Sequence, residues 1–476
     1  MDRARMACRQ SRRRNRKRFE RRVRHRARRA RPDYRKNWIE CQRHLLTPLL
    51  WKAVHAAGRK AVHAAGRSFR ARRWRLMPLV MVAMLTLFLT ARSLGERLEE
   101  ARVLWARVAP NRRRVGRTLE GFLSALGRLP WPALKTLERQ LRPRVAALLE
   151  RRWDVAGWIP FGVDGSRLAL PRYEKLERCF GNPGKGEFPQ MWLTSLVHLP
   201  TGVPWSWRLG KATSSERKHL LQLLPTLPPR SLVVADAGFF GFDGWQRMTR
   251  HGQAFLIRLS SNCSLYVDYE VEWDFTEGLA YLWPTKQQHR AKPLRLRLVR
   301  VAGRNDGGAK HDLWMATNVL ESTELSRETA STLFRMRWEQ EVFYRSYKVT
   351  LAKAKLASRT VGQAVREVEL ALLATQLFLA QANWAAQRGG RARPAGTAPA
   401  ARQVRRELRD LLRGGFRPGY LGRLAESARE HRPTRRSAKS TRDWPRRVPH
   451  QPPGPPKITR MSCELKQAIE KELAAA

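Results

Sequence analysis

From Trp158 to Thr317 the sequence alternates between short apolar runs of strand length and segments with helical spacing, and this pattern constrains the fold more than any other feature. Strands that alternate with helices along a chain are typical of an α/β domain. The expected strands are Trp158–Val163, Met191–His198, Val203–Leu209, Leu232–Ala235, Ala254–Leu259 and Leu313–Thr317, and the helices between them Glu216–Leu224 and Phe242–His251. Residues 265–312 are expected to form a β-rich insertion, because 265–301 is β-like and Leu294–Val299 alternates strictly.

The segment 76–157 has helical periodicity with many arginines on its polar faces, and we expect a helical DNA-binding domain there. Ser93 and Glu96 have the spacing of a capping box, which predicts a helix start. Leu76–Ala91 is almost wholly apolar. Membrane insertion is one interpretation of it, but the run is shorter than the roughly 20 residues that a spanning helix needs and contains Pro78, which favours a buried helix.

The ends of the chain are strongly basic. Residues 1–75 are interpreted as a disordered basic arm, or alternatively as residues upstream of the true start. Residues 386–476 are interpreted as a basic, Pro-rich, linker-like tail. The catalytic domain is expected between them, over 158–385.

The charge of the chain indicates a polyanionic partner. There are 94 Lys and Arg against 40 Asp and Glu, a formal net charge of +54, which argues against an enzyme of small neutral metabolites and favours nucleic acid. Apolar residues make up 42% of the chain, so a packed core is expected as well. The five cysteines form no Cys-x-x-Cys pair, which fits the reducing cytoplasm.

Two expected strands end in an aspartate followed by small residues, Val163-Asp164-Gly165-Ser166 and Ala235-Asp236-Ala237-Gly238. Carboxylates at the carboxyl ends of buried strands lie where α/β sheets hold ligands. The alternative is that each aspartate only caps a turn.

A third acidic residue lies in a segment with helical spacing, expected over 326–351. At about 100° per residue, Phe334, Arg337, Glu341 and Lys348 share an arc of about 60° on an α-helix. The alternative is a surface Arg337–Glu341 ion pair, which leaves the other two residues unexplained.

Together, Asp164, Asp236 and Glu341 would suit Mg²⁺, which prefers oxygen ligands. Two such ions, with Mn²⁺ as a substitute, can support an in-line phosphoryl transfer. Arg337 and Lys348 beside these carboxylates would bind phosphate groups.

The sequence resembles the bacterial insertion-sequence transposases of the DDE superfamily, specifically the YREK-signature group (insertion sequence type four). The resemblance rests on VDGS at 163–166, VVADAGFFGFDGW at 233–245, LWMATN at 313–318 and FRMRWEQEVFYRSYK at 334–348. It implies an RNase H-like mixed-sheet catalytic core with a β-rich insertion, and a metal-binding catalytic triad of Asp164, Asp236 and Glu341.

The resemblance also implies DNA-binding residues. Arg337 and Lys348 would contact DNA near the cleaved end. The signature tyrosine, which contacts a phosphate in the family, is replaced here by Phe334, which has no hydroxyl. Some relatives stack a tryptophan of the insertion on a flipped base. Trp283 or Trp273 could take that role, and the alternative is a core residue.

The predicted function is that of a DNA transposase that binds terminal inverted repeats and catalyses metal-dependent DNA cleavage and strand transfer. Its partners would be the inverted repeats and target DNA, with a homodimer acting on paired ends in the cytoplasm, associated with the nucleoid, and no membrane. The alternative is a non-catalytic basic nucleic-acid-binding protein, such as a decayed transposase.

Overall fold

The computed structural model of the chain describes residues 74–108, 115–184, 186–272, 274–284, 292–301, 312–414, 419–427 and 454–474. Nearly all of the arm expected at 1–75 lies outside these residues, and so does Trp273. The chain divides into two compact units. Unit 1 comprises Met1–Leu149 with Ser358–Arg429, and unit 2 comprises Glu150–Ala357 with Glu430–Ala476. Each unit is therefore assembled from two separate stretches of the chain.

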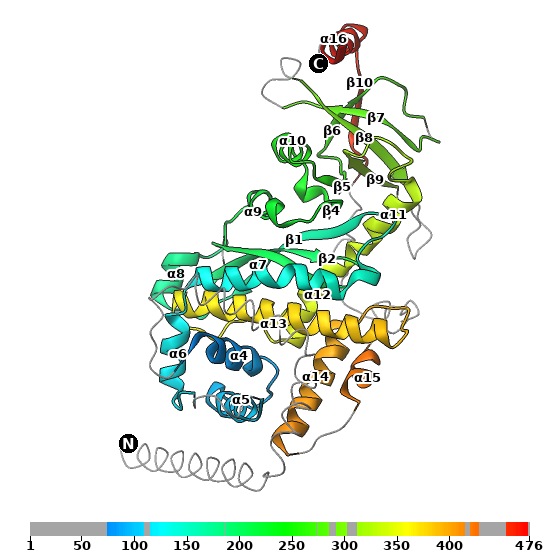
Figure 1. Ribbon diagram of the computed structural model, residues 1–476. Helices are drawn as coiled ribbons and strands as arrows, with labels where there is room; N and C mark the ends of the chain where they lie inside the picture. Colours follow the sequence, from blue (N-terminus) through cyan, green and yellow to red (C-terminus); the bar gives the residue numbers. More distant parts are fainter. Residues whose placement is uncertain are drawn as a thin grey trace, which may run out of the picture. The chain divides into compact units, whose positions relative to one another are not determined.

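Unit 1 is helical in its described part. Its helices are α4 (Leu76–Thr86), α5 (Leu94–Val108), α6 (Leu119–Gly127), α7 (Trp131–Leu148), α13 (Val361–Arg388), α14 (Thr397–Leu412) and α15 (Tyr420–Ala425). The long helix α13 is buried over most of its length because α4, α6, α7, α14 and α15 all pack against it (Figure 1). Ser93 and Glu96 exchange both capping-box hydrogen bonds at the start of α5, as predicted. No helix among the described residues is long and apolar enough to span a membrane, and α4 is largely buried.

The division of the chain differs from the one expected from composition. Residues 358–385, assigned to the catalytic domain, belong to unit 1, and the supposed linker-like tail contributes α14 and α15 to the same unit. The tail also supplies a strand and a helix to unit 2. In α14 the arginines mask an apolar face that is buried in the unit and consists of Ala400, Ala401, Leu408 and Leu411. Composition averaged over the tail hides this short-range periodicity.

Unit 2 is built on one mixed sheet, which has ten strands in the described residues. The strands are β1 (Ile159–Ala169), β2 (Gln190–His198), β3 (Val203–Gly210), β4 (Ser231–Ala235), β5 (Ala254–Arg258), β6 (Ser264–Val267), β7 (Glu277–Leu282), β8 (Leu294–Val301), β9 (Leu313–Thr317) and β10 (Lys457–Arg460). The order is β10-β6-β7-β8-β9-β5-β4-β1-β2-β3. β1 to β3 are antiparallel, whereas β4 and β5 run parallel to β1. The expected α/β class and its β-rich insertion, β6 to β8, are confirmed.

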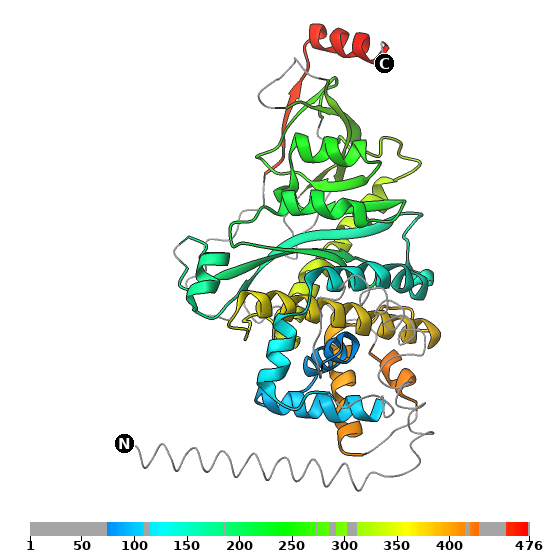
Figure 2. The ribbon, with the colours of Figure 1, turned by 60° about the vertical axis from the view of Figure 1, so that its left-hand side comes forward.

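Helices cover both faces of this sheet. They are α8 (Glu174–Phe180), α9 (Glu216–Leu223), α10 (Phe242–Arg250), α11 (Arg327–Met336), α12 (Trp338–Arg345) and α16 (Cys463–Ala474). Val234 of β4 packs in an apolar cluster with Leu333 of α11. Its neighbour Val233 is paired in register with Phe255 of β5, whose ring lies 4.9 Å from that of Trp245 on α10. Since successive strand residues point to opposite faces, α10 and α11 lie on opposite sides of the sheet (Figures 1 and 2).

A glycine in β1 allows α12 to approach the sheet closely. A Cβ atom on Gly162 would lie 2.6 Å from a methyl carbon of Leu199 and 3.2 Å from the side-chain oxygen of Gln340 on α12. Any larger residue would therefore push α12 away from β1. This matters for function because α12 carries Glu341.

We expect Gly162→Ala to destabilise unit 2 by about 1–3 kcal/mol, because the added methyl group overpacks the contact between β1 and α12. Calorimetric unfolding measures the change. Gly244→Ala in α10 is the matched control, since its Cβ would meet no atom within 4 Å. That variant should be neutral or more stable by up to about 1 kcal/mol, as for Gly to Ala in any exposed helix. Equal effects of the two substitutions would contradict the close approach at Gly162.

A buried imidazole lies at the end of β2. His198 Nε2 is 2.8 Å from the carbonyl oxygen of Trp153, which can only accept, so this nitrogen donates and Nδ1 accepts from the Thr201 hydroxyl at 2.8 Å. The ring also stacks on the Trp153 indole, with centroids 4.4 Å apart. Burial lowers the pKa of His198 to about 4 from its usual 6.5, and the hydrogen bond to Trp153 opposes this only in part. The folded protein therefore keeps this imidazole neutral.

The stability of unit 2 should depend on His198 at acidic pH. The unfolded chain takes up a proton near pH 6.5, whereas the folded chain does so only near pH 4. The stability that His198 contributes is therefore complete above pH 6.5 and is lost as the pH falls to 4. Between pH 7 and 5 the loss should be about 2 kcal/mol. We expect His198→Gln to remove that part of the pH dependence in urea unfolding, and His251→Gln, at an exposed position, to leave it in place.

Candidate active site

Asp164 and Asp236 come together because of strand register. Gly162 of β1 is paired with Val234 of β4, and each aspartate lies two residues further along its strand on the same face. β1 does not end at Val163 as expected but continues to Ala169 along β2; only its pairing with β4 stops before Asp164. Asp164 Oδ1 accepts the Gly165 N–H at 2.8 Å, and Asp236 Oδ1 accepts the Gly238 N–H at 3.2 Å.

Helix α12 is tied to the strands by two buried side chains. Gln340 Nε2 donates to the Ser195 hydroxyl of β2 at 3.0 Å. The Tyr344 hydroxyl accepts from the same serine at 2.9 Å and donates to the backbone carbonyl of Asp164 at 2.6 Å. Gln340 and Tyr344 are one helical turn apart, and Glu341 follows Gln340 directly. These bonds therefore fix the position of α12 along β1 and β2, and with it the position of Glu341.

The predicted Arg337–Glu341 pair is present, with Nη2 2.9 Å from Oε1. The single helix expected over 326–351 is instead divided into α11 and α12 at Arg337, and a π-helical turn, η5 (Ser346–Thr350), follows α12. Lys348 lies in this turn. Burial lowers the pKa of Lys348, and the carboxylate of Asp164 opposes that effect, so the ammonium is close to Asp164.

Two of the predicted carboxylates act electrostatically on the third. The pKa of Asp164 is raised to about 6, mainly by burial; the Gly165 N–H and Arg337 act to lower it, and the negative charges of Asp236 and Glu341 act to raise it. β1, the residue after β4 and α12 therefore place their acidic side chains in one site.

A fourth carboxylate, Glu216, belongs to the same site, and the sequence analysis did not identify it. It lies in the first turn of α9, whose N-cap Ser215 accepts from the Lys218 N–H. A Cβ atom on Gly165 would come within 2.8 Å of its carboxyl carbon. Burial, together with the charges of Asp164 and Asp236, raises the pKa of Glu216 to about 7, and nearby arginines lower it.

A further cation also went unnoticed in the sequence. Arg258 is the last residue of β5. Burial and the charge of Arg337 lower its pKa, and the carboxylate of Asp236 raises it. Neither Glu216 nor Arg258 belongs to a local motif; only the sequence position of Arg258 at a strand end could have pointed to it.

The donor set fits Mg²⁺ by its chemistry. Asp164, Asp236, Glu341 and Glu216 supply only oxygen ligands, which Mg²⁺ prefers. The pKa values of Asp164 and Glu216 are raised mainly by burial and further by neighbouring carboxylates, whose negative charge a divalent cation would neutralise. In the part of the chain that the structure describes, however, no three His, Cys, Asp or Glu side chains are grouped closely enough to hold one ion. One oxygen of Glu341 is bound by Arg337 instead.

The two predicted aromatic DNA contacts are buried. Phe334 belongs to the apolar cluster between α11 and the sheet and is 9% exposed, and the guanidinium of Arg337 lies 5.7 Å from its ring. Trp283 is 5% exposed and packs against Tyr281 and against Ile469 of α16. The position of Trp283 therefore fits its alternative interpretation as a core residue, and contact of either residue with DNA stays a prediction.

Comparison with solved structures and with protein families finds similarities to transposases. Among solved structures, a piggyBac transposase in a synaptic complex with hairpin DNA is similar, with a TM-score of 0.39 and 8% identity over 86% of this chain and 88% of that chain. The comparison with curated proteins gives no match. Residues 161–377 match the family model of the transposase DDE domain. The segment that contains Asp164, Asp236 and Glu341 thus resembles the catalytic domain of DDE-superfamily transposases.

Proposed function

We propose that the chain is a DNA transposase whose unit 2 cleaves and joins DNA by in-line phosphoryl transfer. The observation that carries this proposal is that the negative charges of Asp236 and Glu341 act on the carboxyl group of Asp164, within a segment that matches a transposase DDE domain. The strand order β3-β2-β1-β4-β5, with β1 to β3 antiparallel and the rest parallel, supports an RNase H-like core. We also propose that the chain belongs to the YREK-signature group of these transposases.

In this proposal Asp164, Asp236 and Glu341 hold Mg²⁺, and Glu216 adds a fourth negative charge. Bound Mg²⁺ would lower the pKa of an attacking water and stabilise the leaving oxygen. Arg337 uses one nitrogen for Glu341 and has further N–H donors for a phosphate oxygen. Lys348 supplies a second positive charge beside Asp164. Gln340 and Tyr344 act as positioning residues.

The reaction would proceed in two displacements at phosphorus. In the first, a water oxygen bonds to phosphorus as the bond to the 3′-oxygen of the element's end breaks. In the second, the freed 3′-hydroxyl attacks a phosphate of the target DNA, and the bond from that phosphorus to the 3′-oxygen of the target strand breaks. We propose terminal inverted repeats and target DNA as substrates and a homodimer on paired ends, because two ends must be joined together. The formal charge of +54 supports binding to duplex DNA, and we propose that this binding takes place in the cytoplasm, at the nucleoid.

We expect Glu341→Gln to abolish Mg²⁺-dependent nicking of a DNA end while leaving DNA affinity within about twofold. The substitution removes the charge needed for metal but keeps the shape of the side chain, and the basic surface that binds phosphates is unchanged. Nicking of a supercoiled plasmid and binding of a labelled duplex measure the two properties.

Glu328→Gln, at an exposed position in the first turn of α11, is the matched control and should nick normally. If Glu341→Gln retains full nicking, Glu341 has no part in the reaction. If the unmodified chain binds DNA but nicks with neither Mg²⁺ nor Mn²⁺, the chain is a non-catalytic DNA-binding protein, an outcome that Phe334 in place of the signature tyrosine favours.

We expect the affinity for Mn²⁺ to rise with pH through about 6 to 7, because protons compete with metal for Asp164 and Glu216, whose pKa values are about 6 and 7. Glu216→Gln should bind Mn²⁺ about tenfold more weakly at pH 8. At pH 6 the two proteins should differ little, because Glu216 is already protonated. Titration calorimetry measures both values, and equal affinities at pH 8 would remove Glu216 from the metal site.

A further inference from the structure

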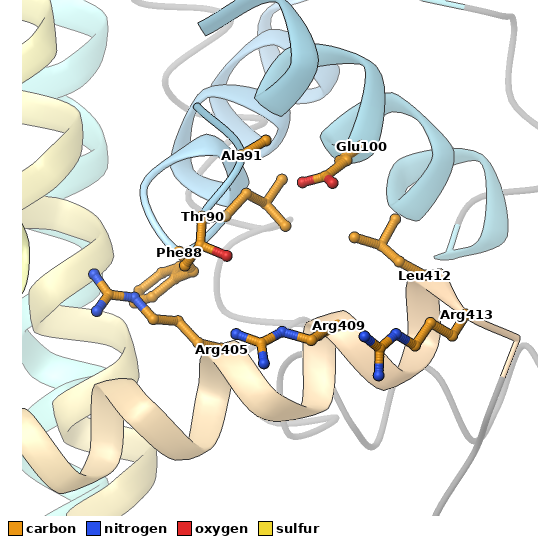
Figure 3. A pocket seen from close by; sticks show the side chains of 9 residues that line it. Phe88, Thr90, Ala91, Glu100, Arg405, Arg409, Leu412 and Arg413 are labelled. Atoms are coloured by element: carbon orange, nitrogen blue, oxygen red, sulfur yellow. The ribbon is translucent and has the colours of Figure 1, made fainter. Parts of the chain in front are cut away.

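Unit 1 contains a cavity whose lining includes no residue of the proposed catalytic site. It has a volume of about 310 Å³ and is lined by the connection between α4 and α5, by α5, and by α14. Three of its lining residues are Arg405, Arg409 and Arg413, and one is Glu100 (Figure 3). Its size is at the lower end of the range for ligand sites in proteins.

The three arginines form a row along one face of α14. They are four residues apart, so each step turns only about 40° and advances about 6 Å along the helix axis. Arg413 is the C-cap and keeps a helical backbone, so the row continues to the end of the helix. Figure 3 shows the three side chains side by side along the cavity, with Glu100 entering from α5 above them.

The lining of the cavity carries more positive than negative formal charge. Burial and the neighbouring Glu96 raise the pKa of Glu100, and Arg409 lowers it, so the carboxylate faces that arginine. One carboxylate against three guanidinium groups leaves a formal charge of +2 on the lining. Arg405 is half-buried, and burial lowers its pKa. An anion in the cavity would therefore offset positive charge that has lost part of its hydration.

A purely structural role explains only part of this arrangement. An attraction between Glu100 and Arg409 would join α5 to α14, but it does not require Arg413 on the same face. Guanidinium groups match the geometry of phosphate oxygens through paired N–H donors. The apolar walls formed by Phe88 and Leu412 would strengthen such a contact by lowering the local dielectric constant.

We propose that the cavity between α5 and α14 binds a phosphate group of the DNA backbone through Arg405, Arg409 and Arg413. This inference rests on the proposed function only in taking DNA as the ligand. It concerns affinity and not cleavage, so it can fail while the nicking experiment with Glu341→Gln succeeds, and the reverse also holds.

The test compares two double variants on the same helix of the full chain. R409Q/R413Q removes two exposed arginines that line the cavity, and R402Q/R406Q removes two exposed arginines that do not. Both variants lose the same charge. Binding of a labelled duplex is measured by fluorescence anisotropy over a series of salt concentrations, with thermal unfolding as a check on folding.

For R409Q/R413Q we expect the slope of log affinity against log salt concentration to fall in magnitude by about 1, since the loss of one phosphate contact removes about 0.9. R402Q/R406Q should change the slope by less than about 0.5. R409K/R413K keeps the charge but not the paired donors, and should keep the slope while binding several-fold more weakly than R402K/R406K.

Inorganic phosphate, added at constant ionic strength, distinguishes the source of the phosphate group. If phosphate raises the unfolding temperature of the unmodified chain but not of R409Q/R413Q, while the DNA slopes of the two glutamine variants are equal, the cavity holds free phosphate and not DNA. Equal slopes together with no effect of phosphate would overturn the proposal.

Discussion

The hydrogen bonds that join α12 to β1 and β2 are the constraint on which the site of unit 2 depends. Tyr344 contacts the backbone of Asp164 itself, and Gln340 contacts the neighbouring strand through Ser195. Gly162 makes room for this approach. Because these groups are buried, removing any one of them would leave an unsatisfied polar atom or a steric clash, and the helix could not keep its height above the strands. The carboxylate of Glu341 is thereby placed relative to residues that precede it by well over a hundred positions.

The site gathers four carboxylates in a chain whose overall charge is strongly positive. They lie among Arg337, Lys348, Arg258, Arg167 and Arg217, and burial is the main reason that two of the carboxylates have raised pKa values. Such an arrangement is costly in a folded protein unless a cation or a ligand compensates for it. The lining of the cavity in unit 1 has three arginines and one acid. The cationic side chains in both places suit the proposed DNA substrate, which brings phosphates to the protein, and a divalent cation among the carboxylates is part of the same proposal.

Much of the fold could be predicted because it depends on local patterns. Short apolar runs placed the strands of unit 2 closely, and the capping box at Ser93 placed the start of α5. The assignment of the tail was poorer. The apolar face of α14 is hidden when composition is averaged over the arginine-rich tail, and the tail helices are stabilised by packing against α13, a contact that composition does not reveal. Contacts of this kind also decide that residues 358–385, expected in the catalytic domain, pack with unit 1.

The sequence by itself determined the aspartates that follow two apolar runs and the Arg337–Glu341 pair, because a helix brings residues four apart together wherever it forms. Only the tertiary structure decided that Phe334 would be buried and that Glu216 would join the site. A helix has one face toward the core and one toward solvent, and the sheet against which it packs determines which residues are covered. Contacts between distant segments follow from strand register and helix packing, which a single sequence does not encode in any local spacing.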